Sequence, residues 1–130
     1  MTTRHLSLAE VLEIHSDQLA RFGGKPGIRD IELLQTTVCI PATDSGDKPS
    51  QNDIFEIAAA YFCHLIQNHP FVDGNMRVGA VAALVFLILN GFDFQGPEVD
   101  FFVLVMGVSQ GLIEKPAVAL FIRRWAKEIP

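Results

Sequence analysis

Residues 69–77 read His-Pro-Phe-Val-Asp-Gly-Asn-Met-Arg and lie between two segments with helical patterns. The stretch places an imidazole, a carboxylate, a carboxamide and a guanidinium within nine residues. Pro70 and Gly74 both resist continuation of a helix, which predicts an irregular loop from Asn68 to Gly74. Since four kinds of polar group gather where one helix must end and the next begin, this loop is the first candidate for a functional site.

The segments on both sides of the loop predict helices. A helix that begins near Asp53 places apolar side chains on one inward face: Phe55, Ala58, Ala59, Phe62, Leu65 and Ile66. From Asn75 to Asn90 the apolar residues cover the whole circumference, which predicts a central helix buried on all sides, and Gly91 ends it.

The rest of the chain completes a predicted all-α bundle of about six helices. Ser7-Leu8-Ala9-Glu10 is a capping box that starts one helix, and Gly23-Gly24 stops it. Asp30 is the candidate N-cap of a short helix that ends near Val38. Two more helices are expected over Pro97 to Met106 and Lys115 to Lys127. Residues 39–51, with two prolines and a glycine, predict an exposed loop or short hairpin, the one place where a strand is expected.

Length and composition predict a single domain, residues 1–130, with one core. The chain is 49% hydrophobic and 19% charged, which excludes the class of disordered proteins. A net charge of −5 argues against a nucleic-acid partner. Cys39 and Cys63 lack the CxxC spacing that is typical of metal-binding and redox sites. The longest apolar run, Val78 to Leu89, is too short to span a bilayer. We therefore expect a cytoplasmic protein that has no membrane partner.

The polar groups of the loop suit a nucleotide phosphate. The helix that begins at Asn75 presents unpaired N–H groups and the positive end of its dipole, and Gly74 permits a close backbone approach. Arg77 can bind phosphate oxygens with both arms of its guanidinium. Asp73 can hold a Mg²⁺ that bridges phosphates. His69, across the loop, can take a proton from an attacking hydroxyl.

Simpler interpretations exist for each piece of the loop. A His-Pro pair after a helix commonly marks only its end, and Asp-Gly-Asn alone is an ordinary turn before a helix. Phe71 is expected in the core under either interpretation, where it would position the loop so that His69 faces outward. The joint pattern favours function, because its chance probability is on the order of 10⁻⁸ per window.

The stretch closely resembles the HxFxDGNxR signature of Fic-fold proteins, and more narrowly the death-on-curing (Doc) toxins. The similarity extends to Arg4–Ser7, Leu12–His15 and Arg21–Asp30, and to the region from Leu84 to Gly91. It covers the chain from about His5 to the last helix.

This resemblance implies a Fic-type helical bundle with a small flap, residues 39–51. The flap residues around Ile40, Pro41 and Thr43 would align the segment of the target protein that is modified. Fic proteins commonly transfer AMP from ATP to a target hydroxyl. Doc toxins instead transfer phosphate to a threonine of translation elongation factor Tu. The resemblance therefore implies a translation-blocking protein kinase that uses ATP and Mg²⁺.

Carried over residue by residue, the resemblance makes His69 the catalytic base and Asp73 the Mg²⁺ ligand. Asn75 and Arg77 would bind phosphate. Together with Gly74 and Met76 they would form an anion cradle, residues 74–77.

Three positions depart from the family pattern. Met76 and Ala80 stand where AMP-transferring members carry Gly and a second Arg, which counts against AMP transfer. Doc toxins usually carry Lys at the position of Met76, so one cation is also missing from the kinase pattern. Ile40 replaces an Arg that precedes Pro in relatives, which affects the choice of target.

Three functions stay open: a Doc-like phosphotransferase, a Fic-type AMP transferase, and a Fic-fold binding module without turnover. The sequence holds no (S/T)xxxE(G/N) inhibitory motif, so a separate antitoxin is expected to restrain the protein through a helix in an apolar groove. His15 and His64 are interpreted as packed or rim residues.

Overall fold

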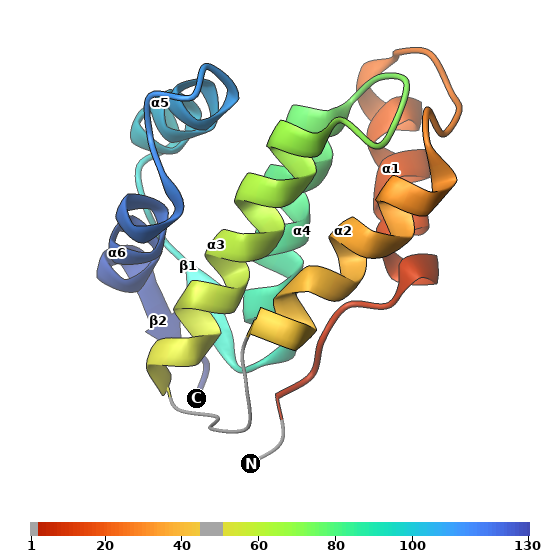
Figure 1. The fold of residues 1–130 in the computed structure, drawn as a ribbon. Helices are drawn as coiled ribbons and strands as arrows, with labels where there is room; N and C mark the ends of the chain where they lie inside the picture. The colour runs from red at the N-terminus through yellow and green to blue at the C-terminus, as the bar shows by residue number, and fades with distance from the viewer. Residues whose placement is uncertain (1–2, 45–50) are drawn as a thin grey trace.

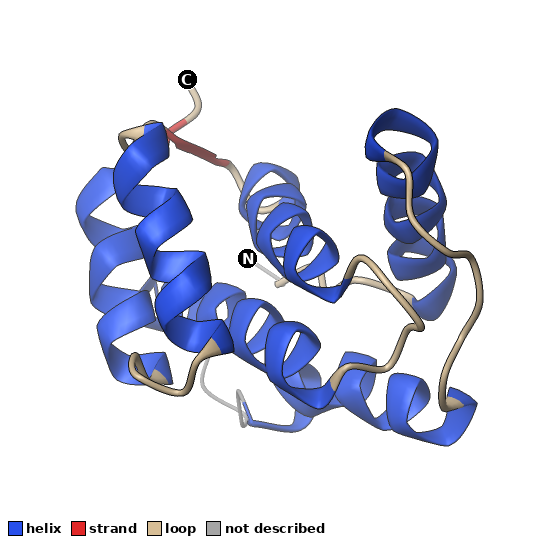
Figure 2. Cartoon of the chain, turned by 90° about the horizontal axis from the view of Figure 1, so that it is seen from above, coloured by secondary structure: helices blue, strands red, loops and turns tan. Residues whose placement is uncertain are grey.

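The structure, a computed structural model, describes residues 3–44 and 51–130 and is predominantly helical in them. Its elements, drawn in Figure 1, are α1 (Leu8–Phe22), α2 (Ile31–Asp44), α3 (Gln51–Asn68), α4 (Asn75–Leu89), β1 (Phe92–Phe94), α5 (Glu98–Ser109), α6 (Lys115–Trp125) and β2 (Ala126–Glu128). The predicted all-α bundle of about six helices is confirmed over the described residues. Seen from above, α5 with α6, α3 with α4, and α1 with α2 follow one another across the molecule (Figure 2).

The cap residues expected for the first helix are present. The Ser7 hydroxyl accepts a hydrogen bond from the Glu10 amide at 3.1 Å, and a Glu10 carboxylate oxygen accepts from the Ser7 amide at 2.9 Å. Gly23 ends α1 at φ 79°, with its amide on the Leu19 carbonyl. Both ends of α1 are therefore set by short local signals that the sequence carries openly.

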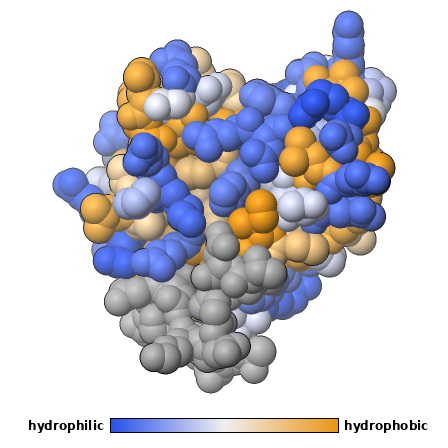
Figure 3. All heavy atoms as spheres, viewed as in Figure 1, coloured by the Kyte–Doolittle hydropathy of each residue, from blue (hydrophilic) through white to orange (hydrophobic). Residues whose placement is uncertain are grey.

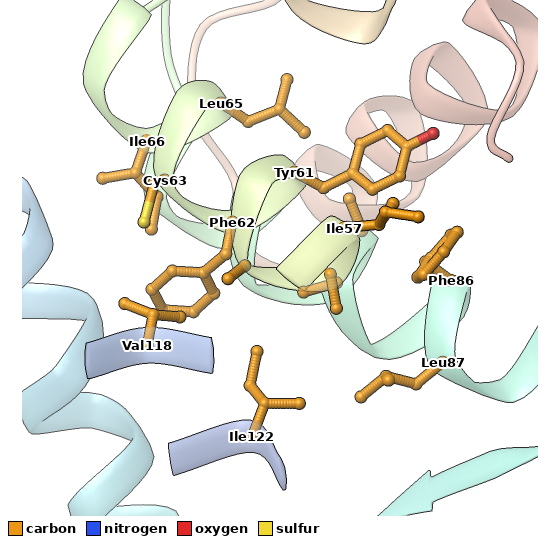
Figure 4. Packing of buried hydrophobic residues seen from close by; sticks show 14 of the residues in the cluster. Ile57, Tyr61, Phe62, Cys63, Leu65, Ile66, Phe86, Leu87, Val118 and Ile122 are labelled. Carbon is orange, nitrogen blue, oxygen red and sulfur yellow. The ribbon is translucent and has the colours of Figure 1, made fainter. Parts of the chain in front are cut away.

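The helix at the centre of the bundle is α3, and not α4 as the apolar pattern predicted, although Glu56 and Gln67 of α3 are exposed. α3 packs against α2, α4, α5 and α6, and its side chains point to opposite sides of the core (Figure 4). Phe62 lies toward Val118 and Ile122 of α6, and Tyr61 lies toward Phe86 of α4.

α4 keeps one side partly open, because the bundle covers only its other face. Ile88 and Leu89 at its C-terminal end are 52% and 38% exposed. Glu56, His64 and Gln67 make α3 look amphipathic in sequence, although nearly all of its apolar residues are buried. Hydrophobicity alone therefore assigned the central position to the wrong helix of this pair.

The strand prediction falls in the wrong place. β1 pairs with β2 in an antiparallel ladder that joins Phe92 to Glu128 and Phe94 to Ala126. Three-residue strands carry too few residues for a period of two to be recognised, and residues 126–127 continued an apparently helical pattern. The small sheet ties the C-terminal segment to the end of α4.

Residues 39–44 are also helical, and not a loop or hairpin. They continue α2 through Pro41, which lacks the N–H that a helix interior uses. Pro41 and Val38 are both buried, so packing of α2 against α3 supports a helical turn that Pro41 alone would break. Residues 45–50 of the predicted flap lie outside the described residues.

Polar and apolar residues alternate over the visible surface, with an apolar area in the region of α5 (Figure 3). Val99, Phe102 and Val103 of that helix are each more than half exposed. Within residues 3–44 and 51–130, no helix combines the length and the apolar character that a membrane span requires.

Candidate active site

The loop of residues 69–74 lies against the loop that joins α1 to α2, at the same end of the bundle (Figure 1). The Val72 amide donates to the Gly27 carbonyl at 3.0 Å, and the Arg29 amide donates to the Pro70 carbonyl at 2.9 Å. Ile28 and Phe71 form an isolated antiparallel bridge between them. The candidate site therefore rests on a second loop that comes from 40 or so residues earlier in the chain.

His69 lies directly after α3 and has a positive φ of 49°. Few residues other than glycine adopt that region, and the cost is of order 1–3 kcal/mol. Arg29 holds this turn: its Nε donates to the His69 carbonyl at 2.6 Å and its Nη2 to the Asn68 carbonyl at 2.9 Å. A cation here also complements the negative end of the α3 dipole. The side chain of His69 is exposed at this end of the molecule.

Asn75 holds the loop from inside. Its Oδ1 accepts from the Phe71 amide and its Nδ2 donates to the Phe71 carbonyl, both at 3.0 Å. Asn75 is 8% exposed and Phe71 only 1%. The carboxamide that was expected to bind phosphate therefore has both of its polar atoms on the backbone of the loop, and Phe71 lies in the core as expected.

Asp73 presents its carboxylate beside the start of α4. Oδ1 accepts from the Gly74 amide at 2.8 Å, and Oδ2 accepts from the Lys25 amide at 3.1 Å. The Lys25 amide and then the Gly74 amide hold the pKa of this carboxyl below its usual range. A carboxylate accepts about four hydrogen bonds or ligands, so each oxygen has capacity beyond its one donor.

We expect Asp73→Asn to lower stability in a pH-dependent way. The folded pKa lies below the unfolded value of about 3.9, so the stability that the carboxylate contributes is full above that value. That contribution is lost as the pH falls through the folded pKa. Urea unfolding gives the free energy of unfolding of both proteins from pH 7 to pH 3. The difference between the two values should be constant down to about pH 4 and should become smaller below it. A difference that stays constant to pH 3, or widens, would contradict the ionised role of Asp73.

Gly74 is the N-cap of α4 in a left-handed conformation, with φ 82° and ψ 10°, and no side chain caps the helix start. An anion can therefore take the place of a cap at this N-terminus. Met76 is half-buried and packs against the core cluster, so its side chain is partly withdrawn from solvent.

Arg77 points back to the end of α1. Its Nη2 donates to the Gly23 carbonyl at 2.9 Å and its Nη1 to the Gln18 carbonyl at 3.4 Å. The guanidinium carbon also lies 5.7 Å from the ring centroid of Phe22. In this structure Arg77 thus binds carbonyls at a helix C-terminus, next to the Asp73 carboxylate.

Gly24 allows this close arrangement, and motif reasoning missed it. A Cβ at Gly24 would lie 2.9 Å from Asp73 Oδ2 and 3.3 Å from Arg77 Nη2. Its φ of 126° also disfavours other residues. Gly24 and Arg29 belong to the stretch Arg21–Asp30 that resembles the family, and that stretch was the only signal in the sequence that could have pointed to them.

The predicted target-contacting residues of the flap, Ile40, Pro41 and Thr43, lie in α2, which precedes the loop of residues 69–74 in the sequence. Ile40 is half-buried and Pro41 is buried, while the side chain of Thr43 lies outside the described residues. α2 is joined to the end of α3 by a hydrogen bond of 3.0 Å from Asn68 Nδ2 to the Thr37 hydroxyl.

Comparison with known proteins identifies the family of this chain. A model of the Fic/DOC family matches residues 5–87, which include the whole stretch from His69 to Arg77. The chain belongs to the Fic/DOC family. It is 32% identical over 123 residues to the protein kinase doc of Escherichia phage P1, across 93% of this chain and 94% of that protein. It is 35% identical over 89 residues to the toxin Doc of Mycolicibacterium smegmatis, across 68% of this chain and 66% of that toxin.

Family membership confirms the resemblance seen in the sequence. The matched residues 5–87 contain the α1–α2 loop together with residues 69–77, so the family region includes both loops of the site. The Fic/DOC region thus covers α1 to most of α4, and β1, α5, α6 and β2 follow it.

Proposed function

We propose that this Fic/DOC protein is a cytoplasmic toxin that transfers phosphate from ATP to a threonine or serine hydroxyl of a translation protein such as elongation factor Tu. We propose further that a separate antitoxin restrains it. One observation carries the proposal. Asp73, whose pKa is lowered, lies beside an α4 N-terminus that no side chain caps, and the exposed His69 lies in the same loop, residues 69–74. The name of the phage P1 relative, a protein kinase, favours phosphate transfer.

The residues present fit a nucleotide with Mg²⁺. No three His, Cys, Asp or Glu side chains gather into a metal site in the described part of the chain. Mg²⁺ needs no such group, because it binds through one or two carboxylates together with waters and substrate phosphates. Asp73 is exposed, its pKa is lowered, and it lies next to the α4 N-terminus that would bind phosphate, so it is the residue that would hold the ion. Bound there, Mg²⁺ would offset charge on the transferred phosphate.

His69 would act on the target hydroxyl. Its imidazole takes the hydroxyl proton as the new bond forms between the target oxygen and the γ-phosphorus. The bond from that phosphorus to the β–γ bridging oxygen breaks, and ADP leaves. Exposure of His69 suits this role, since a protein substrate must reach it from outside.

Arg77 needs a change of partner to bind phosphate. Its guanidinium would exchange the Gly23 carbonyl for a phosphate oxygen, and a charged acceptor forms the stronger hydrogen bond. Asn75, whose amide is bonded to Phe71, would support the cradle by holding the loop. The cradle then binds phosphate mainly through the first amides of α4, since the Gly74 amide already donates to Asp73 Oδ1 and Gly74 serves the close backbone approach.

AMP transfer is the second candidate, and a binding module without turnover is the third. Met76 and Ala80 disfavour the second, because both partly pack against the core and neither carries a charge for phosphate. Ile40 and Met76 motivate the third, because each replaces a cation of the family pattern.

Labelled ATP separates the three functions. The purified protein is incubated with a bacterial lysate and with purified elongation factor Tu, using ATP labelled at the γ- or the α-phosphate. We expect label on a protein only from γ-labelled ATP and an adduct mass of one phosphate. Transfer of the α-label with a nucleotide-sized adduct would support AMP transfer, and binding of Mg·ATP without any labelling would support the binding module.

We expect Met76→Lys to raise the affinity for Mg·ATP. A lysine would add one cation at the start of α4, and a charged contact to phosphate changes binding by about tenfold to a hundredfold. The dissociation constant for Mg·ATP, measured by calorimetry, should fall by about tenfold. Met76→Leu keeps the packing without the charge and should leave binding unchanged. Equal affinities of the lysine and leucine variants would place residue 76 away from the phosphates.

A further inference from the structure

His15 of α1 lies outside the nine-residue loop and yet touches it on two sides. Its ring is stacked on Phe71, with centroids 3.8 Å apart and planes at 7°. Its Nε2 lies 3.0 Å from the Asp73 carbonyl oxygen. A carbonyl only accepts, so Nε2 carries the hydrogen and donates it. His15 is 7% exposed, which leaves little room for the ring to take another position.

The Asp73 carbonyl is one half of a rigid unit. In a planar trans peptide, the C=O of Asp73 and the N–H of Gly74 point in opposite directions. His15 fixes the carbonyl on one side, and the Gly74 amide on the other side donates to Asp73 Oδ1 at 2.8 Å. The same peptide leads into the left-handed Gly74 that starts α4. The orientation of one peptide plane thus sets both the Asp73 carboxylate and the start of the helix.

The α1–α2 loop holds residues 69–74 from one side, and His15 adds a contact from within helix α1. Asn75 bonds the Phe71 backbone from within the motif, and both residues move with the loop. His15 comes from a separate helix, and its ring also lies against Gly74, where an added Cβ would be 3.8 Å from Cδ2. It therefore fixes the loop relative to α1.

We infer that His15 is a positioning residue for the proposed phosphate transfer: its Nε2–H, bonded to the Asp73 carbonyl, orients the Asp73–Gly74 peptide so that the carboxylate and the α4 amides face one ligand. The inference rests on the proposed function. His15 acts through Asp73 and touches no substrate.

Two substitutions divide the contacts of His15. His15→Phe keeps a flat ring on Phe71 and loses the donor, whereas His15→Gln keeps an N–H donor at a similar reach and loses the ring. Two readouts are followed in each: hydrogen exchange of the Gly74 amide, and kcat/KM for transfer from Mg·ATP to purified elongation factor Tu. The Asn90 amide, bonded to Leu87 at the far end of α4, is the internal control for exchange.

We expect His15→Phe to speed exchange at Gly74 and to lower kcat/KM, each by about tenfold, with exchange at Asn90 unchanged. His15→Gln should recover most of both. A His15→Phe protein with the wild-type exchange rate at Gly74 and the wild-type kcat/KM would overturn the inference. So would faster exchange at Gly74 and Asn90 alike, or a glutamine variant no better than phenylalanine. If the wild-type protein transfers no phosphate, the proposed function fails, and exchange at Gly74 still decides whether His15 positions the loop.

Discussion

Replacing His69 with alanine is expected to lower phosphate transfer by at least about a hundredfold while the fold persists. General-base catalysis by a positioned side chain contributes about 10²–10⁴ in rate, and alanine removes the whole of it. The side chain of His69 is exposed, whereas the contacts with Arg29 use backbone carbonyls of residues 68 and 69. The substitution therefore removes the imidazole and leaves those contacts in place. Growth arrest on expression and kcat with purified acceptor are the two measurements.

A second substitution separates chemistry from fold at the same position. His69 has φ 49°, which strains alanine as it does histidine but suits glycine. His69→Gly should be as inactive as His69→Ala, and its free energy of unfolding in urea should be at least as high as that of His69→Ala. Val72→Ala, an exposed position in the same loop, is the matched control and should keep wild-type transfer. Wild-type transfer in His69→Ala would remove the catalytic assignment, and equal loss in Val72→Ala would indicate damage to the loop.

Short local signals in the sequence predicted the parts of the fold that they alone determine. The capping box at Ser7 and Glu10 forms both of its hydrogen bonds, and Asp30 caps α2 through a bond of 3.0 Å from the Leu33 amide. Such bonds join residues three apart, so their pattern is complete in the sequence. The family resemblance likewise began from a contiguous motif of nine residues, residues 69–77, and other stretches of the chain then supported it.

Features that depend on distant neighbours could not be predicted in this way. Pro41 lies within a helix because α2 packs on α3, and β1 finds its partner more than 30 residues later. The site shows the same limit. The motif contains Asp73 and Arg77, but the groups that hold them, the Lys25 amide and the Gly23 carbonyl, belong to the other loop. Only a three-dimensional arrangement reveals that Arg77 binds a helix end and that Asn75 bonds the loop backbone.

Gly79→Ala is expected to lower the free energy of unfolding by about 2 kcal/mol, since overpacking of about 3 kcal/mol exceeds a gain in helix propensity of about 1 kcal/mol. A Cβ at Gly79 would lie 2.7 Å from Ile66 Cγ1 and 2.9 Å from the Phe62 carbonyl oxygen. The Ile66 side chain can rotate away, but the Phe62 carbonyl belongs to the backbone of α3. The two helices must therefore separate. Thermal unfolding should show a midpoint lower by about 8 °C.

Gly107→Ala is the matched control, because Gly107 also lies within an apolar helix. The three atoms nearest to an added Cβ there all belong to the side chain of Ile113, which can move, so we expect a change within about 1 kcal/mol. The distinction reaches the site, since α3 ends and α4 begins at the two sides of residues 69–74. Separation of these helices should displace His69 relative to Gly74, so Gly79→Ala should also lower transfer, while Gly107→Ala should not. A Gly79→Ala protein as stable as wild type, or less affected than Gly107→Ala, would show that α3 and α4 can separate at little cost.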